Sequence, residues 1–185
     1  MVALPTLTIT GPFNAKWLSR VISLPGYTPI PIILWRKELP QTALPWGMFG
    51  ENLTSEGLLE NDLNVGDRLC AGSAEFMVTE PRLPCYKLNV KFGRDDIVKR
   101  FLKSRRTGFY CAVLREGEIG AGDAIHFLNR ADHGVRVADI TRLYAFDRND
   151  TAAMRRAAEI KSLPESWRSY FRERIERLAQ QQNRM

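Results

Sequence analysis

The chain has 185 residues, 44% hydrophobic and 26% charged, a composition typical of one globular domain or of a small domain with an appendage. It has no window of about 18 uncharged apolar residues, and no cationic N-terminal segment leads into an apolar run, so we expect neither a membrane span nor an export signal. The net charge of +6 is compatible with nucleic acid as a partner. The three cysteines are widely spaced and odd in number, which argues against a disulfide framework and for a reducing cytoplasm.

The N-terminal residues 1–34 contain prolines and no histidine. Pro29 and Pro31 cannot donate a ladder hydrogen bond, which disfavours a regular central strand across Tyr27 to Leu34. We therefore predict no such strand in this part of the chain.

Two strands are predicted on either side of a glycine turn. Val65 to Cys70 and Ala74 to Thr79 carry alternating side chains around Gly72 and Ser73. Because Cys70 falls on the first strand, we interpret it as a structural residue.

Three more elements follow in this part of the chain. Asp95 to Lys103 begins with acids and ends with cations, which predicts a short helix, and strands are expected over Gly108 to Leu114 and Ala124 to Leu128. Many short strands with glycine turns predict a barrel or a sandwich. His126 and His133 have no evident partner in the sequence, and we interpret both as structural or solvated.

The hydrophobic period changes from two to the helical value after the loop at 129–134. Three helices are expected, over Val137 to Phe146, Thr151 to Lys161 and Glu165 to Ala179. Each is apolar on one face, so the three should pack as a small bundle. The apolar stripe of the last helix is interpreted as core and comprises Trp167, Phe171, Ile175 and Leu178.

The positive charge is unevenly spread along the chain. Residues 51–133 are close to balanced, whereas arginine is in excess from Gly134 onward. In Trp167 to Arg177, however, arginine alternates with glutamate at helical spacing. This pattern favours a solvated helix face with internal ion pairs over a nucleic-acid surface.

One cysteine is held between two prolines and two cations, in the segment Pro81-Arg82-Leu83-Pro84-Cys85-Tyr86-Lys87-Leu88. Each proline fixes its own φ and extends the residue before it, so Arg82 to Cys85 should form a stiff loop. Arg82 and Lys87 favour the thiolate, the form that attacks and binds thiophilic metals. Free cysteines are more often small buried hydrophobes, and no second Cys or His stands at metal-ligand spacing, so local chemistry leaves both interpretations open.

Two segments together resemble a known family: Gly47-Met48-Phe49-Gly50-Glu51-Asn52-Leu53-Thr54-Ser55-Glu56-Gly57-Leu58, and the loop from Pro81 to Leu88. They are similar to the MOSC domain, the module shared with the C-terminus of molybdenum cofactor sulfurases. More narrowly, the chain resembles bacterial YiiM-type proteins, a group linked to reduction of 6-hydroxylaminopurine. The resemblance implies a mainly β, α+β fold, with a MOSC β-barrel over residues 35–133 followed by a three-helix domain over 134–185.

The resemblance also implies a cofactor site. In the family the cysteine of the Pro-Arg-x-Pro-Cys loop is the protein ligand of molybdenum, so Cys85 is expected to be catalytic and to bind the metal of the molybdenum cofactor, molybdopterin. Arg82 and Lys87 could then hold the phosphate of this cofactor. The family as a whole is also associated with pyridoxal phosphate binding.

Three residues of the first segment complete the expected site. Asn52 and Thr54 could meet the polar edges of the pterin, and Glu51 could accept its N–H groups. The alternative for Gly50 to Thr54 is an ordinary turn that enters a strand.

The activity implied by the resemblance is a two-electron reduction of N-hydroxylated small molecules, such as hydroxylaminopurines or amidoximes. An external flavin or iron–sulfur protein would restore the electrons, because no second cofactor motif is present in the chain. A non-catalytic carrier of the cofactor or of sulfur is the alternative, and a basic protein whose helices bind RNA is a third possibility.

The chain departs from the family before Trp35. The family places a His-Gly-Gly motif, followed by a cation and a tyrosine-rich stretch, there; that motif is absent from residues 1–34, which contain no histidine. Back-translating Gly26 to Ile33 with permitted codons and shifting the frame by two bases reads Leu-Tyr-Pro-Tyr-Ser-His-Tyr, similar to the missing stretch. We therefore hypothesise that residues 1–34 are divergent or partly frame-altered, which would leave one wall of the cofactor site changed.

Overall fold

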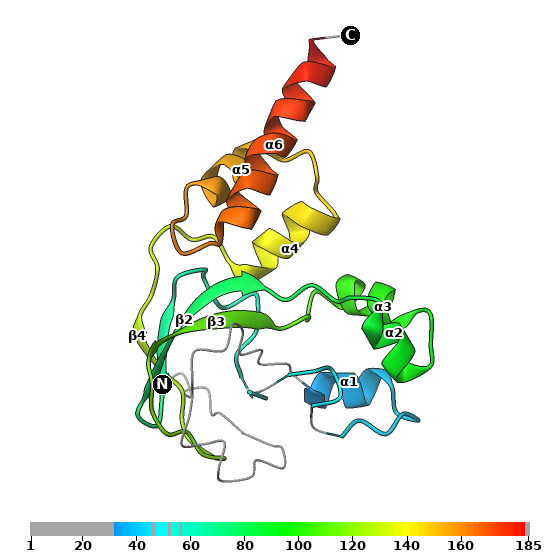
Figure 1. Ribbon diagram of the computed structural model, residues 1–185, viewed down its shortest axis with the longest axis vertical. Helices are drawn as coiled ribbons and strands as arrows, with labels where there is room; N and C mark the ends of the chain where they lie inside the picture. Colours follow the sequence, from blue (N-terminus) through cyan, green and yellow to red (C-terminus); the bar gives the residue numbers. More distant parts are fainter. Residues whose placement is uncertain (1–31, 46, 52, 56, 184–185) are drawn as a thin grey trace.

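The computed structural model describes residues 32–183 apart from 46, 52 and 56 (Figure 1). Its elements, in chain order, are α1 (Ile32–Glu38), β1 (Arg68–Ala71), β2 (Ala74–Pro81), α2 (Lys87–Phe92), α3 (Ile97–Ser104), β3 (Phe109–Arg115), β4 (His126–Asn129), α4 (Val137–Ala145), α5 (Thr151–Ala158) and α6 (Glu165–Gln182). None of these helices is long and apolar enough to cross a bilayer. The frame hypothesis for residues 1–34 falls almost wholly outside the described residues.

The strands form one antiparallel sheet in the order β3-β2-β1-β4. β1 and β2 make the predicted hairpin, in which Ala71 pairs with Ala74 and Gly72 turns the chain at a φ of +53°. A side chain on Gly72 would meet the carbonyl oxygen of Glu118 at 2.1 Å, because the loop before β4 packs directly on this turn. β3 and β4 lie within a residue or two of the strands that the sequence predicted.

The expectation of a closed β-barrel is wrong for the described residues. Their sheet is open, with β3 at one edge and β4 at the other. Closure requires the two edge strands to meet, directly or through further strands, and four strands are too few to curl round a filled interior. The α+β class implied by the resemblance is correct, whereas the barrel or sandwich predicted from short strands and glycine turns is not found in the described residues.

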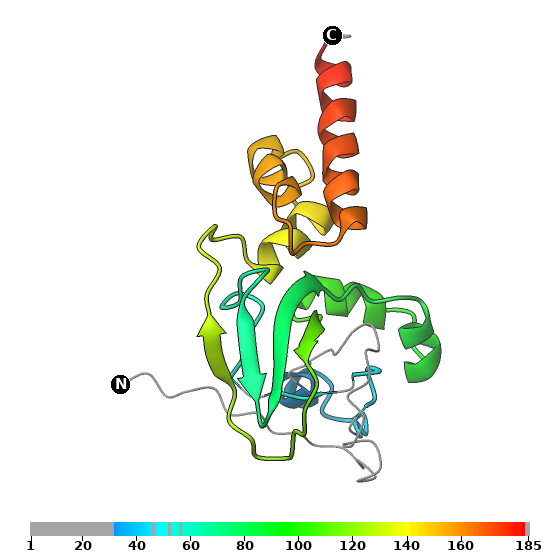
Figure 2. The same cartoon turned by 60° about the vertical axis from the view of Figure 1, so that its left-hand side comes forward.

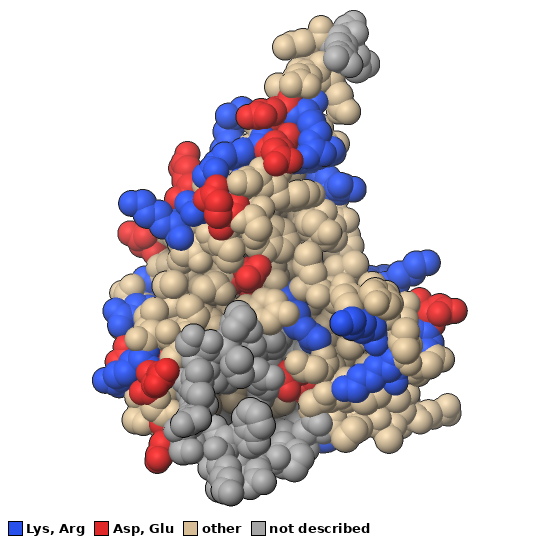
Figure 3. Space-filling model, viewed as in Figure 1, with Lys and Arg blue, Asp and Glu red and all other residues tan. Residues whose placement is uncertain are grey.

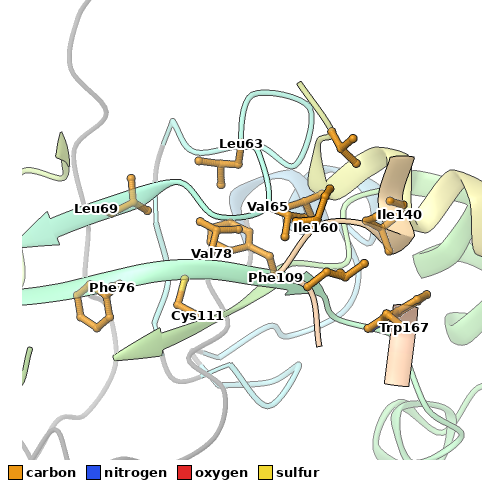
Figure 4. Packing of buried hydrophobic residues seen from close by; sticks show 14 of the residues in the cluster. Leu63, Val65, Leu69, Phe76, Val78, Phe109, Cys111, Ile140, Ile160 and Trp167 are labelled. Carbon is orange, nitrogen blue, oxygen red and sulfur yellow. The ribbon is translucent and has the colours of Figure 1, made fainter. Parts of the chain in front are cut away.

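The main hydrophobic core lies between the sheet and the C-terminal helices, which stand together at one end of the sheet (Figures 1 and 2). α4 packs against β2, and α5 packs along α6. The core includes strand residues such as Leu69, Phe76 and Val78 and residues of the helical part such as Ile140, Ile160 and Trp167; in Figure 4, Leu69 and Phe76 lie at the far end of the strands from Ile140 and Trp167. Burying each such side chain contributes about 1.5–3 kcal/mol, so the helices and the sheet stabilise one another.

The predicted core stripe of the last helix is confirmed. Trp167, Phe171 and Ile175 are 8%, 0% and 9% exposed, respectively, whereas the fourth predicted residue, Leu178, is only half-buried. The charged residues between them face solvent and form ion pairs, including Arg177 with Glu173 at 2.8 Å. Helical spacing alone separated these two faces of α6.

Two short helices were not predicted. α1 covers Ile32–Glu38, just beyond the prolines that disfavoured a strand, and α2 begins at Lys87, two residues after Cys85. Proline at position 84 extends the residue before it, and the helix starts once that restriction ends. Gly93 ends α2 in the left-handed conformation at a φ of +61°, the usual helix stop for glycine.

The two histidines differ in environment. His126 is exposed on β4. His133 Nδ1 accepts the N–H of Val135 at 3.0 Å, so its Nε2 carries the hydrogen and donates to the carbonyl oxygen of Val65 at 2.7 Å. His133 thus joins two loops and is a structural residue, as the sequence suggested, while His126 is solvated.

A single polar contact ties the last helix to the end of β2. The indole N–H of Trp167 donates to the Glu80 carboxylate at 2.5 Å. Burial raises the pKa of Glu80, and the indole hydrogen bond opposes that rise by favouring the charged form. Because Pro81 and Arg82 follow Glu80 directly, this bond fixes the strand end from which the Cys85 loop departs.

We predict that Trp167→Phe lowers the free energy of unfolding by about 1.5–3 kcal/mol at neutral pH, because the half-buried Glu80 carboxylate loses its donor. The loss should shrink as the pH falls and Glu80 becomes protonated. Tyr170→Phe is the matched control, since this change on the same helix removes a buried hydroxyl without a partner among the described residues. Chemical denaturation measures both variants, and an equal loss in both would contradict the assigned bond.

Candidate active site around Cys85

The two segments that suggested a family lie side by side. The Arg82 side chain donates through Nη2 to the carbonyl oxygen of Phe49. Lys91, on α2, donates through Nζ to the carbonyl oxygen of Gly47 at 2.9 Å. The turn at 47–51 is therefore held from outside by cations of the Cys85 loop and of the helix after it.

Glu51 holds the same turn from within. It is 8% exposed, and its two carboxylate oxygens accept the N–H groups of Gly47 and Phe49 at 2.7 and 3.0 Å. Gly47 and Gly50 adopt positive φ values of 77° and 80°, which few other residues tolerate. The geometry gives Glu51 a role in building the turn, and its expected contact with the pterin stays a prediction.

An aromatic cluster lies beneath the turn and joins it to α1, α2 and α3. The Trp35 ring stacks on Phe101 at 4.7 Å between centroids, and Phe49 lies 5.4 Å from Trp35 and 5.1 Å from Phe101. Phe92 completes the cluster at 5.2 Å from Phe49. Such pairs add about 0.5–1.5 kcal/mol each to the burial of their surface, so the turn rests on a rigid base.

Arg82 connects this cluster to the sheet. Its guanidinium carbon lies 6.0 Å from the centroid of the Phe101 ring, and its backbone N–H donates to the carbonyl oxygen of Gly108 at 2.9 Å. The N–H of Gly108 in turn donates to the buried Glu60 carboxylate at 2.7 Å. The second guanidinium nitrogen, Nη1, is buried and has no hydrogen-bond partner in the described part of the chain.

Cys85 presents its thiol to solvent. The backbone N–H of Lys87 donates to its Sγ at 3.4 Å, and its carbonyl oxygen accepts the N–H of Leu88 at 3.0 Å, which fixes the residue at the start of α2. Cys70 is half-buried on β1 and Cys111 is buried on β3. Burial raises the pKa of the Cys111 thiol to about 12, so this thiol is inert.

The remaining predicted residues fall in different places. Thr54 is buried at 4% exposure beyond the turn, and Asn52 lies outside the described residues. The Lys87 side chain is exposed, so its link to Cys85 is made by its backbone and not by its ammonium group. No cluster of three or more His, Cys, Asp or Glu side chains that could hold a metal exists among the described residues.

Sequence reasoning missed two residues that support the site. Lys91 holds the turn at Gly47. Lys91 lies four residues after Lys87 and so on the same helix face, but this spacing is informative only once α2 is known to be a helix. Glu60 supports Gly108, and the sequence around it, Leu58-Leu59-Glu60-Asn61-Asp62, gives no signal of this role. Both act through backbone groups, so neither carries a motif.

Residues 32–126 match the MOSC domain family and residues 137–178 match the YiiM-like three-helix domain. The chain belongs to the MOSC family. Its C-terminal helices place it among the YiiM homologues within that family, as the resemblance suggested.

Three relatives show the extent of the similarity. YflK of Bacillus subtilis is 37% identical over 130 residues, which cover 70% of this chain and 59% of YflK. A Gibberella moniliformis protein named reductase is 32% identical over 70% of this chain, which corresponds to 23% of that protein. The crystal structure of YiiM from Geobacillus stearothermophilus superposes with a TM-score of 0.73 at 35% identity, covering 77% of this chain and 73% of that one. The chain thus spans less than two thirds of YflK and of the Gibberella protein.

We predict that Cys85 is the first cysteine to be alkylated in the native protein. Iodoacetamide should label it at least tenfold faster than Cys111, because an exposed thiol reacts and a buried one with a raised pKa does not. Mass spectrometry of the digested protein at successive times measures the order. Unfolded protein is the control, in which all three sites should react at similar rates, and faster labelling of Cys111 in the native protein would refute the assignment.

We predict that Glu60 makes stability depend on pH. Burial raises the pKa of Glu60 above the value of about 4.5 that it has in an unfolded chain. The contribution of this shift to the stability of the fold is therefore complete below pH 4.5 and is lost as the pH rises through the folded pKa. Glu60→Gln keeps an acceptor for the Gly108 N–H and lacks the titration. The unfolding free energy of Glu60→Gln should therefore rise relative to that of the wild type as the pH increases from 4.5 to 8. Parallel plots of unfolding free energy against pH for the two proteins would disprove this.

Proposed function

We propose that this protein binds the molybdenum cofactor through Cys85 and reduces N-hydroxylated small molecules of the hydroxylaminopurine or amidoxime type. The observation that carries the proposal is the thiol of Cys85, the cysteine that the fold exposes, on a loop joined to the family's glycine turn. Membership of the MOSC family and the name reductase given to a distant relative support it.

The residues present fit such a cofactor. A thiolate is a suitable donor for a thiophilic metal, and a single protein donor suffices where the other sulfurs come from a pterin dithiolene. The buried Arg82 Nη1 has no partner among the described residues, and a buried donor of this kind gains when an anion such as phosphate binds it. Lys87 adds an exposed cation next to the thiol.

The chain's own residues would hold the site in shape. Pro81 and Pro84 limit the conformations of the loop, and the Lys87 N–H donates to Sγ, which helps to fix the position of the sulfur. Arg82 binds the turn at Phe49 with one nitrogen and keeps the other for an anion.

When bound, the cofactor supplies two-electron redox chemistry, and conversion of an N–OH group to N–H and water consumes two electrons and two protons. We propose that an external flavin or iron–sulfur protein provides the electrons, in the cytoplasm.

We predict that protein purified from a host that makes the cofactor contains molybdenum, and that Cys85→Ala lowers the content at least tenfold. Cys70→Ala is the matched control and should retain the wild-type content, because Cys70 is half-buried on β1. Mass spectrometry of the metal measures all three proteins. Equal molybdenum in wild type and Cys85→Ala would refute the ligand assignment. Bound molybdenum without turnover of an amidoxime by dithionite-reduced viologen would instead favour the alternative, a carrier of the cofactor.

A further inference from the structure

The pair of helices that follows Cys85 carries a concentrated positive charge. Residues 86–106 contain eight Lys and Arg and two Asp, so this segment has a formal charge of +6, equal to that of the whole chain. Lys and Arg side chains gather over α2 and α3 in the space-filling view (Figure 3). The charge is therefore localised beside the candidate site.

Part of this charge is neutralised and part is not. Asp96 pairs with Arg94 at 2.8 Å and with Arg100 at 2.7 Å, and the hydrogen bond from Arg94 holds the pKa of Asp96 well below its usual range. Lys87, Lys99 and Lys103 are exposed, and no ion pair to them exists within the described residues. Three cations thus remain available to a partner.

The start of α2 also exposes two large apolar side chains. Tyr86 is 71% and Val90 75% exposed, more than any other large hydrophobic residue in the described chain. They stand four residues apart at the start of α2 and so share one face, next to Cys85. We define the α2–α3 face as Tyr86, Lys87, Val90, Lys99 and Lys103.

We propose that the α2–α3 face is the docking surface for an acidic electron-donor protein. This inference rests on the proposed function, which requires an external donor. An apolar centre with charge around it is the usual anatomy of a protein interface, and complementary charge raises the rate of encounter without demanding tight binding. A partner seated on Tyr86 and Val90 would bring its redox centre against Cys85.

The observations favour an acidic protein as the partner over single-stranded RNA and over an anionic lipid membrane. Single-stranded RNA is bound by successive aromatic platforms in a basic groove, and this face offers one exposed aromatic, Tyr86. Lipid binding by an amphipathic helix requires a broad apolar face, whereas α2 has only six residues and buries Leu88 inward. A small acidic protein matches the positive charge of this face and its two exposed apolar side chains.

The test measures binding of two probes, a purified acidic flavodoxin and an acidic [2Fe–2S] ferredoxin, by titration calorimetry at low and high salt. Lys99→Glu/Lys103→Glu should weaken binding of at least one probe by about tenfold or more at low salt, since rim charges govern such encounters. The matched control is Arg155→Glu/Arg156→Glu, which makes the same charge change on exposed residues of α5 and should alter binding less than about twofold. Val90→Ser should weaken the binding that persists at high salt.

Several outcomes would overturn the proposal. The first is that neither probe shows salt-dependent binding, and the second is that the two charge reversals have equal effects. The third is that neither protein probe binds, while a 20-nucleotide RNA or phosphatidylserine vesicles bind and lose that binding in Lys99→Glu/Lys103→Glu. Molybdenum content and viologen-driven turnover distinguish this failure from that of the proposed function. Both should be unchanged in all three variants even if the docking surface lies elsewhere.

Discussion

The aromatic cluster of Trp35, Phe49 and Phe101 is the contact on which the candidate site depends. Its rings come from α1, from the glycine turn and from α3, three segments that share no backbone pairing. Arg82 lies over one ring and bonds the carbonyl of another residue of the cluster, so the Cys85 loop takes its position from the cluster as much as from the sheet. This second core is separate from the one that joins the sheet to the C-terminal helices.

Much of the fold could be predicted from the sequence because its elements follow simple periods. The β1–β2 hairpin followed from alternation around Gly72, and α4, α5 and α6 followed from helical spacing. The family followed from two short motifs, which the structure brings into contact through Arg82 and Phe49. Local patterns of this kind are written in consecutive residues and need no knowledge of tertiary packing.

The remaining features depend on contacts between distant residues. The open sheet, the buried Glu60 carboxylate under Gly108 and the use of Glu51 to build its own turn arise from packing that no local pattern specifies. The charge distribution was hidden for a different reason. Averaging residues 51–133 gave a balanced domain, although eight of its cations fall within the 21 residues from 86 to 106.

The exposure of Cys85 has a consequence beyond ligand binding. A solvent-accessible cysteine is oxidised by peroxide before a buried one, to a sulfenic acid and then irreversibly to higher acids. Cys111, enclosed by the sheet, is protected from this chemistry. Any group that covers the Cys85 sulfur would therefore also protect it from oxidation.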